Sequence, residues 1–157
     1  IAIGLVMILG TFVFHAYALD RLMRLLTPFI RRAKSPIERA IHLSRAKVLL
    51  ITSLGVICIL SAEIWAWAFL YLSLDLKAVQ NLETALYFSM ASFTTVGYGD
   101  IVLGPHDRLL GAMQATSGML LFGWSTAFIF EVLSIVYAHT RLRDLTSSSG
   151  PSVEWKK

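Results

Sequence analysis

The chain has 157 residues, of which 56% are hydrophobic and 15% charged, and its formal net charge is +4. Ordinary soluble domains carry about 25% charged residues, and disordered tails combine low hydrophobicity with high charge, so both classes are excluded. The composition predicts an all-α integral membrane protein with several spans. The basic residues cluster beside the apolar runs, where they report orientation, and we therefore expect a lipid bilayer and no nucleic acid as partner.

The first apolar run, residues 1–19, contains His15 as its only potentially charged side chain. Because about 20 helical residues cross a bilayer core, we predict an additional N-terminal transmembrane helix over residues 1–26. A cleaved signal peptide is the alternative. The run lacks a charged start and a clear small-residue cleavage site, which favours the transmembrane helix.

A basic segment follows, in which residues 20–47 hold eight basic and two acidic side chains. We predict that Thr27-Pro28 ends the first helix and that residues 27–47 form a cytoplasmic linker. Ser35-Pro36 has the pattern of a helix start and favours a short helix in the membrane interface. An irregular basic linker is the alternative.

The remaining apolar runs predict an outer helix over 48–74 and an inner helix over 108–140, with a tail at 141–157. The connection between the two helices is poor in basic residues, whereas the linker and the tail are rich in them. The positive-inside rule then places residues 20–47 and the C-terminus in the cytoplasm, and the N-terminus outside a plasma membrane. We expect the aromatic residues near the outer surface, Trp65, Trp67, Tyr71 and Tyr87, to join the aromatic belt.

The connection itself is too apolar for an ordinary loop and too short for two spans. Residues 82–93 predict a helix with Asn81 as N-cap, and a dozen residues give about 18 Å of helix, half a bilayer. Residues 94–100 then read Thr-Thr-Val-Gly-Tyr-Gly-Asp. Non-helical backbone at membrane depth needs protein or a water-filled cavity around it, so the pattern predicts a re-entrant pore helix followed by a loop.

The loop suits a dehydrated monovalent cation, which needs a cage of oxygens in place of its water. Backbone carbonyls supply that cage if they all point to one side, and Gly97 and Gly99 tolerate the left-handed dihedrals this requires. Val96 and Tyr98 would point away from the ion and pack against the surrounding wall. The pore helix would aim its negative C-terminal end at the inner cavity.

Thr-Val-Gly-Tyr-Gly-Asp at 95–100 resembles the selectivity filter of potassium channels. The similarity extends from residue 82 to about residue 134, which with the preceding outer helix makes up a pore module over 48–140. It implies a homotetramer around one pore, which conducts potassium ions passively and is not an enzyme. K+ would be the bound permeant ion, held by the carbonyls of Thr95, Val96, Gly97 and Tyr98, with support from Thr94, Gly99 and Asp100.

Two departures from the family pattern matter. Some relatives carry a glutamate in the pore helix where this chain has Ala91, so a carboxyl contact with Asp100 is missing and inactivation behaviour does not transfer. The N-terminal span is additional to the simplest two-span pores. It does not resemble a voltage sensor, because Arg21 and Arg24 do not continue into a regular arginine series.

Helical spacing marks one face of the inner helix as a candidate pore lining, formed by Leu120, Gly123 or Trp124, Ala127, Glu131 and Ile135. Gly118 and Gly123 are the candidate gate glycines of the same helix. Glu131 would form a carboxylate ring near the inner mouth that attracts cations; the alternative is a structural carboxylate paired with a linker arginine or a hydroxyl. Gly118 is either a hinge or a close packing site.

Glu63 stands alone in the outer helix, where an isolated buried carboxylate is costly. It is a candidate pH-sensitive group. The alternative is a satisfied structural contact to the pore helix or to the first span, for which His15 is a candidate partner.

The sequence thus predicts a potassium-selective channel subunit. A weakly selective cation channel is the alternative within transport, and a non-conducting regulatory membrane subunit is the alternative outside it.

Overall fold

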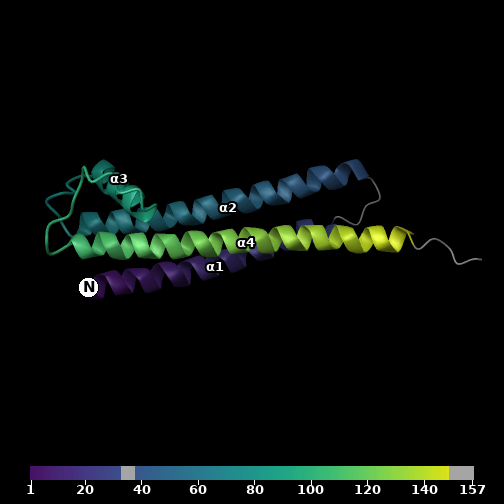
Figure 1. The fold of residues 1–157 in the computed structure, drawn as a ribbon, viewed down its shortest axis with the longest axis horizontal. Helices are drawn as coiled ribbons and strands as arrows, with labels where there is room; N and C mark the ends of the chain where they lie inside the picture. The colour runs from purple at the N-terminus through teal and green to yellow at the C-terminus, as the bar shows by residue number, and fades with distance from the viewer. Residues whose placement is uncertain (33–37, 149–157) are drawn as a thin grey trace, which may run out of the picture.

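Four helices, and no strand, form the part of the chain that the computed structural model describes, residues 1–32 and 38–148. They are α1 (Ala2–Arg32), α2 (Glu38–Ser73), α3 (Leu82–Phe93) and α4 (Arg108–Ser148). The three long helices α1, α2 and α4 run side by side, and the short α3 lies at one end of their bundle (Figure 1).

The three long helices are also the ones that are long and apolar enough to cross a membrane. Their candidate spans are Ala2–Pro28, Ala46–Ser73 and Arg108–Ala138. The N-terminus lies at the same end as α3, whereas α1 ends, α2 begins and α4 ends at the other (Figure 1). The expected all-α membrane architecture with three spans and a short helix between the last two is confirmed.

One face of α1 is buried against α2 and α4, and the opposite face is apolar and exposed. The buried side chains recur every three or four residues, as a helical stripe requires: Thr11, His15, Leu19, Leu22 and Leu26. The side chain of Leu22 lies directly over Gly55, where an added Cβ would meet it at 2.7 Å. Such small residues let membrane helices approach closely.

The expected break at Thr27-Pro28 is absent, because α1 continues to Arg32 with Pro28 inside the helix. A proline removes one backbone hydrogen bond, here the one that the Arg24 carbonyl would accept. Arg24 is exposed near the end of the candidate span, where water can satisfy its carbonyl. The Thr27 hydroxyl also donates to the Met23 carbonyl at 2.9 Å. The proline is therefore tolerated within the helix.

The prediction of a separate interfacial helix is also wrong for the described residues of the linker, 38–47. Residues 38–47 form the first turns of α2, which continues without a break to Ser73. No glycine or proline stands between 38 and 54 to interrupt it. The predicted start at Ser35-Pro36 lies outside the described residues. α4 likewise runs on to Ser148, beyond the predicted end at residue 140, because no glycine or proline stands between residues 140 and 148.

The interior of the bundle contains aromatic side chains that were expected at the membrane surface. Trp67 and Tyr71 are both fully buried, whereas Trp65 is 39% exposed. Tyr71 packs edge-on against Phe88 of α3, with ring centroids 5.0 Å apart. The position of an aromatic residue along the span does not decide whether it is buried. The face of the helix decides it, because residues 67 and 71 share a face that α3 and α4 cover.

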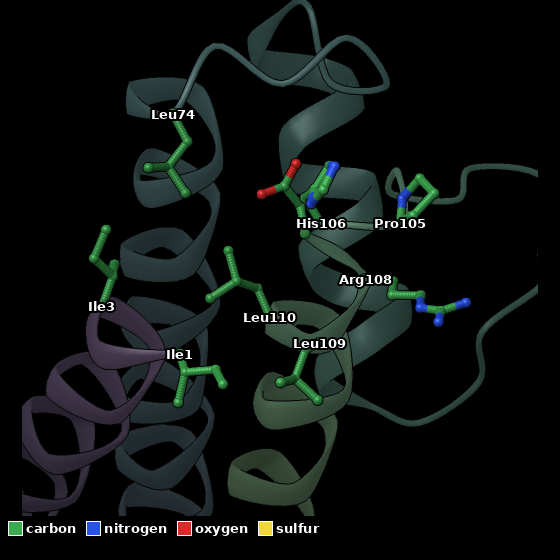
Figure 2. Close-up of a pocket in the computed structure, with 9 residues that line it drawn as sticks. Ile1, Ile3, Leu74, Pro105, His106, Arg108, Leu109 and Leu110 are labelled. Carbon is green, nitrogen blue, oxygen red and sulfur yellow. The ribbon is translucent and has the colours of Figure 1, made fainter.

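A cavity of about 450 Å³ lies at the α3 end of the bundle, between the start of α1, the end of α2 and the start of α4 (Figure 2). Ile1, Ile3, Leu74 and Leu110 gather on its apolar side, and the Arg108 side chain points away from them (Figure 2). None of the predicted site residues lines this cavity.

Candidate functional site

The short helix α3 is fixed at its N-terminal end by the cap that the sequence predicts. The Asn81 carboxamide oxygen accepts from the Thr84 amide at 2.8 Å and from the Thr84 hydroxyl at the same distance. This satisfies one of the unpaired amides of the first turn. α3 therefore starts at Leu82 and ends at Phe93, as expected.

The C-terminal end of α3 lies deep in the bundle, against α4. A Cβ built on Gly118 would lie 2.1 Å from the Phe93 carbonyl oxygen, so the two backbones are in direct contact. Gly118 is ten residues into α4, which at 1.5 Å per residue is about 15 Å from the start of that helix. The segment thus enters and leaves at the same end of the bundle, which is the geometry of a re-entrant loop.

A buried hydrogen-bond network holds α3 between α2 and α4. The Ser89 hydroxyl donates to the Ile64 carbonyl at 2.7 Å. The side-chain Nε2 of Gln114 donates to the Ser89 hydroxyl at 2.8 Å and to the Ser89 backbone carbonyl at 3.1 Å. The Tyr71 hydroxyl completes the network by donating to the side-chain oxygen Oε1 of Gln114 at 2.7 Å. Sequence reasoning missed Ser89 and Gln114, because a lone polar residue in an apolar helix does not reveal its partner.

The loop after α3 alternates its backbone conformation residue by residue. Thr95, Gly97 and Gly99 have positive φ values of 60°, 49° and 79°, and the residues between them do not. The Gly97 amide donates back to the Ala91 carbonyl at 3.1 Å, so this amide is directed toward α3. Alternation between positive and negative φ can turn successive carbonyls toward one side, which is the arrangement that a row of cation-binding carbonyls needs.

Thr95 is the member of this alternation that the glycine pattern does not predict. A non-glycine residue with positive φ is uncommon, and the hydrogen bond from its amide to the Ser92 carbonyl, 3.0 Å, fixes it in place. The signal available in the sequence is its spacing, two residues before Gly97 and four before Gly99.

At the other end of the loop, Asp100 is bound by a tyrosine of α3. The Tyr87 hydroxyl donates to an Asp100 carboxylate oxygen at 2.7 Å, and the Tyr87 ring stacks on Tyr98 with an interplanar angle of 12°. This hydrogen bond holds the pKa of Asp100 below its ordinary value and raises the pKa of Tyr87. The tyrosine hydroxyl therefore supplies a contact for Asp100 in a chain that has Ala91 instead of a glutamate.

We expect Tyr87→Phe to raise the pKa of Asp100 toward its ordinary value, because the substitution removes the hydrogen bond that favours the carboxylate. A depressed folded pKa contributes stability above the ordinary aspartate value, about 3.9, and that stability is lost as the pH falls through the folded pKa. NMR titration of the Asp100 carboxyl measures the shift. Tyr137→Phe, which removes an exposed hydroxyl from α4, is the control. An identical Asp100 titration in both variants would contradict the prediction.

The predicted cavity-lining positions of α4 share an uncovered face. Leu120 is 56% exposed, Gly123, Ala127 and Glu131 are exposed, and Ile135 is half-buried. Across the described ranges 1–32 and 38–148, the Glu131 side chain has no hydrogen bond or ion pair. Trp124 lies on the same face, four residues after Leu120 and seven before Glu131, and it contacts α1 there, because its ring lies 5.5 Å from that of His15.

The two inner-helix glycines near α3 are packing sites. Beside Gly118, which contacts the Phe93 backbone, a Cβ on Gly111 would lie 3.3 Å from the Phe88 ring. The close approach at Gly118 favours the packing alternative over the hinge.

Glu63 contacts His15 of the first span, which was one of the alternatives that the sequence left open. One of its carboxylate oxygens lies 2.8 Å from His15 Nδ1, and both side chains are buried. No group of three or more histidine, cysteine, aspartate or glutamate side chains within residues 1–32 and 38–148 has the arrangement of a metal site.

The model of the ion channel family matches residues 56–135, slightly more than half of the chain. The chain belongs to the ion channel family. The matched segment begins in α2, includes all of α3 and the loop that follows, and ends in α4, whereas α1 precedes it. No curated protein and no solved structure matches the chain. The family match and the three candidate spans together make the protein a membrane channel that conducts ions passively.

Proposed function

We propose that this ion channel is selective for potassium and that the loop at 94–100 is its filter. The observation that carries the proposal is the alternation of positive φ at Thr95, Gly97 and Gly99 in a loop that begins deep in the bundle. K+ ions would bind to the carbonyls of Thr95, Val96, Gly97 and Tyr98, which replace the ion's hydration shell. Thr94, Gly99 and Asp100 support this row.

The electrostatics of α3 favour a cation in the same place. The C-terminal end of a helix carries roughly half a negative charge, and that end of α3 lies next to the start of the loop. The Asp100 carboxylate lies at the opposite end of the loop, and the hydrogen bond from the Tyr87 hydroxyl lowers its pKa. A monovalent cation therefore meets negative potential at both ends of the carbonyl row.

A single chain supplies one row of carbonyls, and a closed ion cage requires several, so we propose a homotetramer. Val96 and Tyr98 are 54% and 73% exposed in the single chain, which leaves both for a neighbouring subunit to cover. The channel would lie in the plasma membrane. By the positive-inside rule the N-terminus and α3 face outside, and residues 20–47 and the C-terminus face the cytoplasm.

The inner cavity is proposed to be lined by the uncovered face of α4. That face contains Leu120, Gly123, Ala127, Glu131 and Ile135. The absence of a partner for Glu131 in the described part of the chain supports a carboxylate ring over a paired structural carboxylate. Four such carboxylates would raise the local potassium concentration at the inner mouth.

Ion flux from liposomes tests this function. We expect the purified protein to pass K+ much faster than Na+, and external Ba2+ to block the flux. Gly99→Ala, reconstituted at the same density, is the matched control for leak, because a side chain at a φ of 79° disturbs the carbonyl row and leaves the three spans unchanged. Equal Na+ flux would point to a weakly selective cation channel, and no flux of either ion would point to a regulatory subunit.

A further inference from the structure

All three spanning helices meet at one buried imidazole. His15 of α1 contacts Glu63 of α2 through Nδ1, at 2.8 Å, and Ser125 of α4 through Nε2, at 3.3 Å. His15 and Glu63 are 0% and 1% exposed. We call these three residues the His15 junction. It connects α1, which lies outside the segment that matches the ion channel family, to both spanning helices of the pore module.

Packing alone does not explain the polar groups at the junction. An ionisable side chain inside a membrane is costly and is retained mainly where it has a function, and well-packed apolar residues often replace a buried ion pair without loss of stability. The pair has no net charge when it holds one proton in total, either as imidazolium and carboxylate or as imidazole and carboxylic acid. A second proton from solution leaves imidazolium and carboxylic acid, with one uncompensated positive charge.

The surroundings offer no other charge to compensate this change. On α4 the neighbour is the Trp124 ring. On α1 the Thr11 hydroxyl donates to carbonyls of its own helix. On α2 the second carboxylate oxygen of Glu63 and the indole N–H of Trp67, one turn further on, both lack a hydrogen-bond partner in the described residues.

The other titratable groups on these helices are engaged elsewhere or directed outward. Asp20 pairs with Arg24, and Arg21 contacts Tyr17, all near the far end of α1. Tyr71 donates to Gln114. Among the residues whose burial the structure describes, the remaining titratable side chains of these helices are exposed: Lys47, Cys58, Arg108, Glu131 and Tyr137. Proton uptake at the junction is therefore not balanced by a neighbouring ionisable group.

We propose that the His15 junction couples proton uptake to the pore: with one proton it holds α4 against α1, and a second proton releases α4. Ser125 lies on the part of α4 that carries Gly123 and Ala127, two of the proposed cavity positions. The contacts of His15 resist displacement of α4 relative to α1 and α2, and opening the pore requires the inner helix to move. Release by acid therefore increases conduction. This inference rests on the proposed potassium conduction for one of its two readouts.

The first readout is K+ flux from liposomes between about pH 7.5 and about pH 4, a range that covers ordinary imidazole and carboxyl titration. We expect acidification to raise wild-type flux by about fivefold or more, the lower end of typical coupling between sites. His15→Gln and Glu63→Gln should remove this rise. Thr11→Val is the matched control, because it removes a buried polar group from the same face of α1 and should titrate like the wild type.

Ser125→Ala tests the connection to α4 separately. It removes the contact with His15 and leaves the His15–Glu63 pair intact. We expect raised flux at neutral pH and a smaller further rise with acid. Asp100 and Tyr87 are present in every variant, so their titration cancels in the comparison.

The second readout does not need conduction. Infrared difference spectra of the protonated carboxyl, recorded over the same pH range, should contain a titrating band that is lost in Glu63→Gln and shifted in His15→Gln. A titrating band without K+ flux at any pH would contradict the proposed function and leave the proton chemistry supported. The coupling is overturned if the band does not titrate, or if Glu63→Gln and the wild type share one pH profile of flux.

Discussion

A single methyl group at position 118 is expected to destabilise the folded channel strongly. In Gly118→Ala the new Cβ would lie 2.1 Å from the Phe93 carbonyl oxygen and 3.0 Å from its carbon. These are backbone atoms at the end of α3, so no side-chain rotation relieves the contact. Overpacking of a core costs about 1–3 kcal/mol when side chains adjust, and we expect more where the pore helix itself must move.

Thermal unfolding of the purified protein in detergent measures this effect. Gly123→Ala is the matched control on the same helix, because no atom lies within 4 Å of its built Cβ. Replacing a helical glycine by alanine there should gain about 1 kcal/mol of helix propensity. We therefore expect Gly118→Ala to lower the unfolding temperature strongly and Gly123→Ala to keep or raise it. Equal unfolding temperatures would show that α3 and α4 do not approach as described.

Loss of the Gln114 side-chain amide is expected to have the next largest effect. Gln114→Leu keeps a side chain of similar size and removes three hydrogen bonds, which leaves the Tyr71 hydroxyl without its acceptor and Ser89 without its donor. An unsatisfied buried polar group costs about 1–3 kcal/mol, so we expect a loss of about 3 kcal/mol. Because the network positions α3, K+ selectivity should fall as well.

Denaturant unfolding followed by tryptophan fluorescence, together with K+ and Na+ flux, checks this prediction. Thr116→Val is the control, since that exposed hydroxyl donates to the Ala112 carbonyl of its own helix and to no other element. Stability and selectivity that are the same in Gln114→Leu and Thr116→Val would mean that the network does not hold the pore helix.

The local features of the pore segment are predictable from the sequence because their signals are local. The Asn81 cap, the extent of α3 and the glycines of the loop depend on a few neighbouring residues, and the structure places each as expected. The spans are predictable because length and apolarity decide them. The end of α1 and the start of α2 were less predictable. Pro28 stands near the end of α1 and removes only one backbone hydrogen bond, which is too little to end the helix.

The contacts between elements were not predictable, because they depend on which helical faces meet. Gln114 and Ser89 are 25 residues apart, and nothing in either segment indicates the other. Trp67 and Tyr71 look like surface aromatics until α3 covers them. Sequence reasoning offered His15 as a candidate partner for Glu63, but the third member, Ser125, is 110 residues from His15 and had no signal.

The most direct test of the central claim is the reversal potential of the current in a planar bilayer with K+ on one side and Na+ on the other. If the carbonyls at 95–98 form a potassium filter, the wild-type current should reverse far from zero, in the direction that favours K+, and Ba2+ should block it. A reversal potential near zero, with current carried equally by both ions, would contradict a selective filter at this loop.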